Sequence, residues 1–314
     1  MTAHAPLDRS RRTTNPPAST VTSVLQWFDE NARPLPWRCE TRTPWGVLVS
    51  EVMLQQTPVH RVLPLWTAWM QRWPTPTDLA AAGADEVLRA WGRLGYPRRA
   101  RWLHRSAQRI VTDYDGLVPD DETRLRTLPG VGEYTAAAVC AFAFDKPTLV
   151  LDTNVRRVIS RVHDGRAAPL AHLTNPERTF AARLVEAAGD RGARWSAAVM
   201  ELGAVVCQAR RPECLRCPLI DACRWRALGF PDSGVPLRRT ASYEGSDRQA
   251  RGALLARLRD STEPLSRDDL AGEWPDATQC ERALASLIGD GLVHADAKGY
   301  RLGPGEPGSA EGIA

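Results

Sequence analysis

The sequence predicts an all-α main domain, followed by a small unit that combines helices with a β-hairpin. Apolar residues recur three and four positions apart, which is the spacing of a helix with one buried face. This spacing is found in residues 24–27, 52–63, 87–94 and 103–111. Breaks that contain proline or glycine separate the stretches at residues 33–36, 73–76 and 116–119. No long apolar-polar alternation interrupts this pattern, so we expect residues 21–229 to be helical almost throughout.

A change of composition marks the end of this domain. Residues 230–247 are rich in Pro, Gly, Ser and Arg, and they are predicted to be a linker. Beyond the linker, a helix is expected over residues 249–259, with Leu254 and Leu258 on its buried face. The segments 1–20 and 304–314 are expected to be disordered tails.

Capping signals predict the rest of the C-terminal domain. Ser266 is followed three residues later by Asp269, and Thr278 by Glu281, which is capping-box spacing. Residues 292–302 then predict two short strands that turn at Lys298-Gly299. Three helices and a hairpin, in this order, predict a winged-helix-like domain over residues 248–303. Arginines are available there for DNA backbone contacts: Arg248, Arg251, Arg257 and Arg301. The alternative is a small packing domain that makes no contact with DNA.

Composition and charge limit the possible partners and locations. The 314 residues carry a net charge of +4, and the positive charge is almost all arginine, with Lys146 and Lys298 as the two lysines. A basic excess is compatible with a polyanionic partner without proving one. The longest apolar stretch, residues 136–144, is too short to span a membrane. Residues 1–20 lack the apolar core of a secretory signal, with mitochondrial targeting as a weaker alternative. We therefore expect a cytoplasmic, nucleoid-associated protein.

Seven cysteines in such a chain point to a metal site or catalysis before disulfides. Four of them are close in sequence, with six, two and five residues between them: Cys207, Cys214, Cys217 and Cys223. Four thiolates in one short loop can hold a metal centre. Structural zinc is one reading, although zinc sites usually use two CxxC pairs and only one is present here. The loop also carries Arg210, Arg211 and Arg216, which could reach phosphates.

A glycine turn between two helical stretches predicts a phosphate contact. In the sequence Leu128-Pro-Gly-Val-Gly132, two glycines lie one residue apart before a helix. Such a turn lets the backbone approach a ligand and turns amides toward it, although a lone GxG is usually an ordinary turn. Asp152 follows about twenty residues later, and a helix-hairpin-helix followed by an aspartate is typical of base-excision glycosylases. The alternative for Asp152 is a buried capping residue.

The segment Ser50-Glu-Val-Met-Leu-Gln-Gln-Thr57 closely resembles the signature of MutY-type adenine DNA glycosylases, in the endonuclease III superfamily. Flanking matches are Leu35-Pro-Trp-Arg38, Leu94-Gly-Tyr96 and Met200-Glu-Leu-Gly203. The resemblance covers residues 21–226 and implies a helix-hairpin-helix DNA glycosylase fold. It also implies that the four cysteines hold a 4Fe-4S cluster rather than zinc.

The resemblance implies the catalytic roles. Glu51 would be the general acid that protonates N7 of adenine, with its pKa raised by an apolar pocket. Asp152 would stay ionised and stabilise the positive charge that develops on the sugar. Tyr134 stands where bifunctional relatives place a lysine nucleophile, so the enzyme would be monofunctional and use water. Tyr134 would also support Asp152, and Asn154 would orient water or Glu51.

The resemblance also implies how DNA is bound. Arg38 would contact the flipped adenine, and Gln56 and Tyr96 would fill or wedge the base stack. The turn residues Gly130, Val131 and Gly132 would hold a phosphate. The expected partner is double-stranded DNA that contains A:8-oxoG or A:G mispairs, bound by a monomer.

Three departures from the family pattern weaken part of this reading. Tyr96 is followed by Pro97 instead of a second tyrosine, and Ala197 replaces a usual Gln or Glu. The 91 residues after Cys223 are too few for the NUDIX-like domain that reads 8-oxoguanine. Two alternatives stay open: a thymine glycosylase for T:G mismatches, and an iron–sulfur DNA-binding regulator without catalysis. Glu51 argues against the first, and Glu51 together with Asp152 at the family spacing argues against the second.

Overall fold

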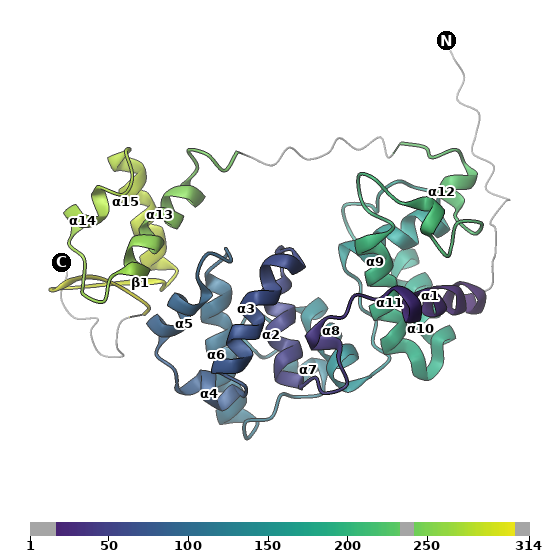
Figure 1. Ribbon diagram of the computed structural model, residues 1–314, viewed down its shortest axis with the longest axis horizontal. Coiled ribbons are helices and arrows are strands. Elements are labelled where there is room, and N and C mark those ends of the chain that lie inside the picture. Colours follow the sequence, from purple (N-terminus) through teal and green to yellow (C-terminus); the bar gives the residue numbers. More distant parts are fainter. Residues whose placement is uncertain (1–16, 233–241, 305–314) are drawn as a thin grey trace, which may run out of the picture. The chain divides into compact units, whose positions relative to one another are not determined.

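The computed structural model describes residues 17–232 and 242–304 (Figure 1). Most of the two predicted tails and half of the predicted linker, residues 233–241, lie outside these residues. The chain forms two compact units, each built from two separate stretches. The first unit comprises residues 17–42 and 133–232, and the second comprises residues 43–132 and 242–304.

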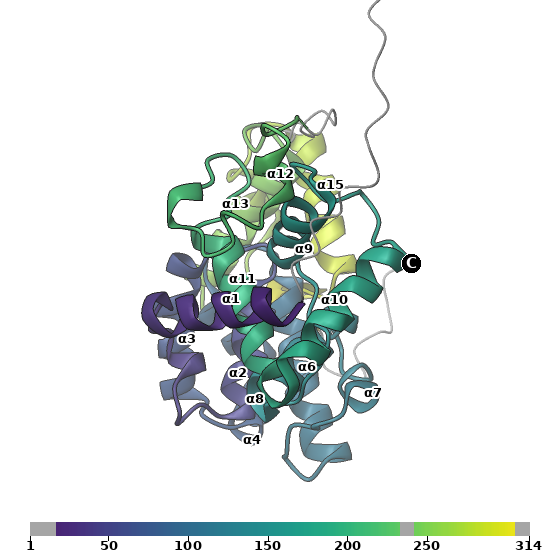
Figure 2. The same ribbon diagram turned by 90° about the vertical axis from the view of Figure 1, so that its right-hand side faces the viewer.

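The first unit is built from helices in both of its stretches. They are α1 (Pro17–Asn31), the short η1 (Pro36–Arg38), α8 (Glu133–Phe144), α9 (Thr153–Ile159), the π-helical turn η2 (Ser160–Asp164), α10 (Asn175–Ala188), η3 (Gly189–Arg191), α11 (Gly192–Val205), η4 (Cys214–Arg216) and α12 (Arg224–Ala227). Helix α1 packs against α10 and α11 (Figure 2). Because α1 begins at Pro17, residues 17–20 are helical, and the predicted tail extended too far into the chain.

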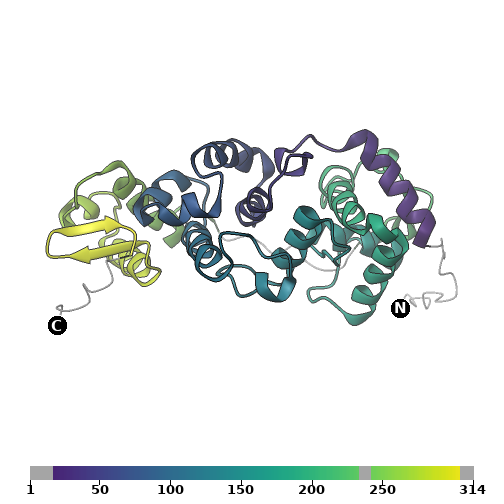
Figure 3. The ribbon, with the colours of Figure 1, turned by 90° about the horizontal axis from the view of Figure 1, so that it is seen from below.

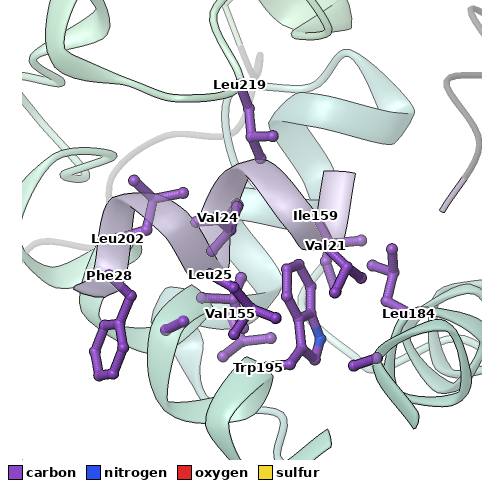
Figure 4. Packing of buried hydrophobic residues seen from close by; sticks show 14 of the residues in the cluster. Val21, Val24, Leu25, Phe28, Val155, Ile159, Leu184, Trp195, Leu202 and Leu219 are labelled. Atoms are coloured by element: carbon purple, nitrogen blue, oxygen red, sulfur yellow. The ribbon is translucent and has the colours of Figure 1, made fainter. Parts of the chain in front are cut away.

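One apolar core joins these helices across a long sequence separation. Val21, Val24 and Leu25 from α1 lie against Trp195 and Leu202 (Figure 4). The apolar positions of α1 fall three and four residues apart, so the helix buries one face and leaves the other to solvent. The core also includes Val155 and Ile159, the buried side of α9, and this fixes the helix that begins at Asp152.

The second unit begins with α2 (Pro44–Leu54), α3 (Val59–Arg72), α4 (Pro76–Ala81), α5 (Ala84–Trp91), α6 (Arg98–Asp113) and α7 (Glu122–Leu125). Thr43 and Thr75 cap α2 and α4, and each is followed by a proline in the first helical turn, where no amide donor is needed. In the core, the Trp69 ring lies edge-on to Trp73 and Trp91, at centroid distances of 4.9 and 5.5 Å.

The helical stretch predicted over residues 52–63 is in fact two helices. Helix α2 ends at Leu54 and α3 begins at Val59. Pro58 has no amide proton and disfavours a helical conformation of Thr57, while Gln56 has a left-handed φ of 54°. Apolar periodicity continued across this turn and hid the break.

The C-terminal elements belong to the second unit by their contacts. They are α13 (Asp247–Asp260), α14 (Arg267–Ala271), α15 (Ala277–Gly289), β1 (Val293–Asp296) and β2 (Gly299–Leu302). The two strands are antiparallel, with Val293 opposite Leu302 and Asp296 opposite Gly299 (Figure 3). This is the predicted order of three helices and a hairpin.

The capping of these helices agrees with the prediction at only one of two positions. Ser266 and Asp269 form the expected capping box of α14. Helix α15 is capped instead by Asp276, which accepts the Gln279 amide, so the predicted start at Thr278 was two residues late. The Glu281 carboxylate pairs with Arg267 at 2.7 Å.

Among the described residues, no helix is both long enough and apolar enough to cross a membrane.

Candidate active site

The glycine turn lies between α7 and α8, where the chain passes from the second unit to the first. Gly130 and Gly132 are exposed, whereas Val131 is buried and its amide donates to the Leu128 carbonyl at 3.1 Å. The backbone at the two glycines can therefore face a phosphate, while Val131 anchors the turn. Gly130 has a φ of 77°, and a Cβ there would come within 2.9 Å of the Trp102 side chain. Both conditions require glycine.

Glu51 lies on α2 in the second unit and is 5% exposed. The whole helix from Trp45 to Met53 is buried, and most of its side chains are apolar. Burial of an ionised carboxylate is costly unless it is compensated, so a buried glutamate in an apolar helix needs a specific reason.

Gln56 and Tyr96 both lie in exposed turns with left-handed backbone conformations. The φ angles are 54° for Gln56 and 48° for Tyr96, an arrangement that is strained for residues other than glycine. The Tyr96 side chain is 49% exposed, so it is not a core tyrosine. Both residues are exposed to solvent.

The two turns are joined by a residue that the sequence reasoning missed, Arg99. Its guanidinium is buried and donates to the carbonyl of Gln55 at 2.6 Å, to the Thr57 hydroxyl at 2.9 Å and to the carbonyl of Gly95 at 3.1 Å. It also lies 5.3 Å from the centroid of the Tyr96 ring. Burial lowers the pKa of Arg99 to about 10. A charged residue four positions before Leu103, on the apolar stripe of α6, was the signal that could have revealed it.

We expect Arg99→Met to destabilise the protein and loosen both turns. The substitution leaves several buried carbonyl oxygens without a donor, which predicts a loss of about 2–5 kcal/mol in the free energy of unfolding. Urea unfolding of the full chain measures it. The matched control is Arg105→Met, an exposed arginine on the same helix, which should change that free energy by less than about 0.5 kcal/mol. Equal effects of the two substitutions would contradict the joining role.

Asp152 lies in the first unit as the N-cap of α9. One carboxylate oxygen accepts the Val155 amide at 2.6 Å, and the other accepts the Asn154 side-chain amide at 2.7 Å. Burial raises the pKa of Asp152 above its ordinary value, while the hydrogen bonds from Val155 and Asn154 act in the opposite direction. Asp152 is thus both a capping residue and a half-buried carboxylate, and the two interpretations do not exclude one another.

Asn154 is directed at Asp152. Its amide group donates to the Asp152 carboxylate, and its carbonyl oxygen accepts from Arg157 at 2.7 Å. Arg157 in turn donates to the backbone carbonyls of Gly203 and Cys207, each at 2.7 Å. A chain of hydrogen bonds therefore runs from Asp152 to the first residue of the cysteine loop.

A second missed residue is Glu201 on α11, which is fully buried. It accepts from Arg33 at 2.5 and 2.9 Å and from Arg38 at 2.8 Å. Burial alone would raise the pKa of Glu201, but the two guanidinium groups outweigh it and lower the pKa to about 2. Arg38, the predicted base contact, is thus held by Glu201. Tyr134 is half-buried on α8 and packs against an apolar cluster that includes Ala137, Ala141 and Val150.

The four cysteines of the loop line one cavity, together with Arg161 and apolar side chains. None of them forms a disulfide. Arg161 is 2% exposed, and its guanidinium donates to the Cys207 sulfur at 3.3 Å and stacks on Trp225 at 4.5 Å. Within the described ranges, no three His, Cys, Asp or Glu side chains converge on a single metal ion.

Comparisons with known proteins show which family the chain belongs to. The family model for HhH-GPD superfamily base excision DNA repair proteins matches residues 49–178. The adenine DNA glycosylase of Mycolicibacterium smegmatis is 52% identical over 297 residues, which cover 91% of this chain and 97% of that protein. The human adenine DNA glycosylase is 43% identical over 65% of this chain and 39% of its own length. A solved thermostable thymine-DNA glycosylase has a TM-score of 0.60 and 26% identity, over 68% of this chain and 97% of that one.

The family match spans Glu51, the glycine turn and Asp152, so the protein is a helix-hairpin-helix glycosylase of base excision DNA repair. Within that class the chain belongs to the adenine DNA glycosylase family, because it covers nearly the whole of a relative that is more than half identical. The resemblance to MutY-type enzymes that the sequence indicated is confirmed.

Proposed function

We propose that this protein is a monofunctional adenine DNA glycosylase that removes adenine opposite 8-oxoguanine or guanine in double-stranded DNA. The observation that carries the proposal is the buried Glu51 in a chain related over almost its full length to an adenine DNA glycosylase. The enzyme acts as a cytoplasmic, nucleoid-associated monomer.

The proposed reaction divides the chemistry between two carboxyl groups. Glu51 donates a proton to N7 of the extruded adenine, the C1′–N9 bond breaks, and its electron pair stays with the base. The Asp152 carboxylate stabilises the positive charge left on the sugar. Water then bonds to C1′ and gives a proton to the Glu51 carboxylate, which restores the acid. Asn154 supports this step by holding the Asp152 carboxylate.

Monofunctional chemistry predicts that no covalent intermediate forms with the enzyme. Tyr134 occupies the position of the lysine nucleophile, and neither Lys146 nor Lys298 belongs to the glycine turn. Borohydride added during turnover should therefore trap no protein–DNA adduct, and the abasic product should need hot alkali to break. Efficient trapping by the unmodified enzyme would contradict this prediction.

The cysteine loop fits a 4Fe-4S cluster held by Cys207, Cys214, Cys217 and Cys223. The observation that supports the fit is the donor set: the side chains of all four cysteines line one cavity. When bound, the cluster would supply a structural brace for the loop and its arginines.

We expect the purified protein to be yellow-brown, with about four irons and matching sulfide per chain. Metal analysis and the visible absorption spectrum measure this. Stoichiometric zinc without sulfide would contradict the cluster and leave the loop as a zinc site.

Base release from a panel of duplexes tests the proposed function. Duplexes with A:8-oxoG, A:G, A:C and T:G pairs are incubated with excess enzyme, and strand breaks are counted after alkali. We expect cleavage at adenine in A:8-oxoG and A:G and none at thymine. The T:G duplex is included because a solved relative of similar fold is a thymine-DNA glycosylase. Release of thymine with adenine left intact would select that alternative, and binding without any release would select the DNA-binding regulator.

A further inference from the structure

The loop between α5 and α6, residues 92–97, carries Tyr96 in a strained conformation. Gly92, Gly95 and Tyr96 all have positive φ angles, of 55°, 90° and 48°. A non-glycine residue in this region persists only when its surroundings hold it there. Arg99 supports the middle of the loop through the Gly95 carbonyl. The two ends of the loop have a different support.

At the first end, α5 and α13 cap one another. Arg259, at the end of α13, donates to the Gly92 carbonyl at 2.6 Å. In return, Arg89 on α5 donates to the carbonyls of Leu258, at 3.4 Å, and Arg259. The last carbonyls of a helix lack partners within the helix and carry partial negative charge, so each arginine satisfies the end of the other helix.

At the second end of the loop, Asp290 and Gly291 contact the start of α6. The Asp290 carboxylate lies 3.4 Å from Arg98 and accepts from Arg251 of α13 at 2.6 Å. Arg101 donates to the Asp290 carbonyl. Gly291 has a φ of 63°, and a Cβ there would lie 2.5 Å from the Arg101 guanidinium. The backbone of the C-terminal unit is therefore fitted closely to α6.

Within the C-terminal part of the second unit, residues 242–304, other arginines have acidic partners. We call this part the C-terminal unit. Arg257 pairs with Glu273 at 3.4 Å, Arg267 with Glu281 at 2.7 Å and Arg282 with Asp247 at 2.8 Å. Arg251, an expected phosphate contact, is committed to Asp290 and Ser286. The side-chain hydrogen bonds and ion pairs that join these elements to α5 and α6 thus lie at the two ends of the Tyr96 loop.

We propose that residues 242–304 are a positioning device for the Tyr96 loop, acting through Arg259 at one end and Asp290 at the other. The inference rests on the proposed function in one respect: it assigns Tyr96 to base extrusion. In this account the C-terminal unit acts on the excision rate by keeping the wedge preorganised.

The test uses Arg259→Gln and Asp290→Asn in the full chain, with Arg282→Gln as the control. Arg282 pairs with Asp247 inside the same C-terminal unit and touches neither end of the loop. Hydrogen–deuterium exchange of the peptide covering residues 92–99 should speed up about tenfold in the two test variants and not in the control. Unchanged exchange in both test variants would overturn the proposal, whether or not the protein excises adenine.

Single-turnover excision from A:G duplexes tests whether the C-terminal unit acts on the excision rate through Tyr96. Asp290→Asn and Arg259→Gln should each slow excision about tenfold, and neither should slow it further when Tyr96→Ala is already present. Additive losses would show that the C-terminal unit acts independently of Tyr96 and would overturn the proposal. If the parent protein releases no adenine, the proposed function fails, and the exchange measurement still decides whether the loop is held.

Discussion

Glu51→Gln is expected to bind A:G duplexes as the parent protein does and to release adenine about a hundredfold to ten-thousandfold more slowly. Glutamine preserves the size and polarity of the side chain but has no acidic proton for N7. The loss should therefore fall on the chemical step, which single-turnover kinetics isolate, while the dissociation constant from fluorescence anisotropy stays within a factor of about three.

Glu86→Gln is the matched control for this substitution. Glu86 belongs to the same unit, lies on α5 and forms an exposed ion pair with Arg72. An exposed ion pair contributes little, so the control should excise at the parental rate. If Glu51→Gln released adenine as fast as Glu86→Gln does, Glu51 would have no part in the mechanism.

Asp152→Asn is expected to lose excision by about a hundredfold or more, because it removes the charge that stabilises the sugar cation. Asparagine is as good an N-cap as aspartate, so α9 should remain intact. The control is Asp276→Asn, which changes the N-cap of α15 in the same way. In single-turnover kinetics, Asp276→Asn should excise at the parental rate and Asp152→Asn about a hundredfold or more slowly. Similar rates for the two variants would contradict the role of Asp152.

The raised pKa of Asp152 fixes the sign of two pH effects. Excision by the parent enzyme needs the anion, so the rate should fall as pH falls through this pKa, which lies above the ordinary value for aspartate. A buried aspartate with a raised pKa costs stability at pH values where it is ionised. Asp152→Asn should therefore melt at or above the parental temperature at pH 7. A lower melting temperature would show that its hydrogen bonds outweigh its burial.

The sequence predicted the parts of this site that depend on local pattern. Helical periodicity, proline breaks and the spacing of the four cysteines are properties of short segments, and the structure has helices and a shared cysteine cavity where they were expected. Periodicity failed at Gln56, because one helix and two successive helices with aligned apolar faces produce the same pattern.

The missing parts depend on pairs that are distant in sequence. Glu201 meets Arg33 across 168 residues, and Arg259 reaches Gly92 across 167. Nothing in the neighbourhood of either residue specifies its partner. A charged residue on an apolar stripe, such as Arg99, signals only that a buried partner exists.

Direct detection of free adenine tests the central claim most closely. An A:G duplex is incubated with an excess of the protein, the small molecules are separated by chromatography, and the released base is identified by mass. We expect one adenine per duplex with intact strands before alkali, and release at least about a hundredfold slower with Glu51→Gln. Release of another base, or adenine release by Glu51→Gln at the parental rate, would contradict the claim.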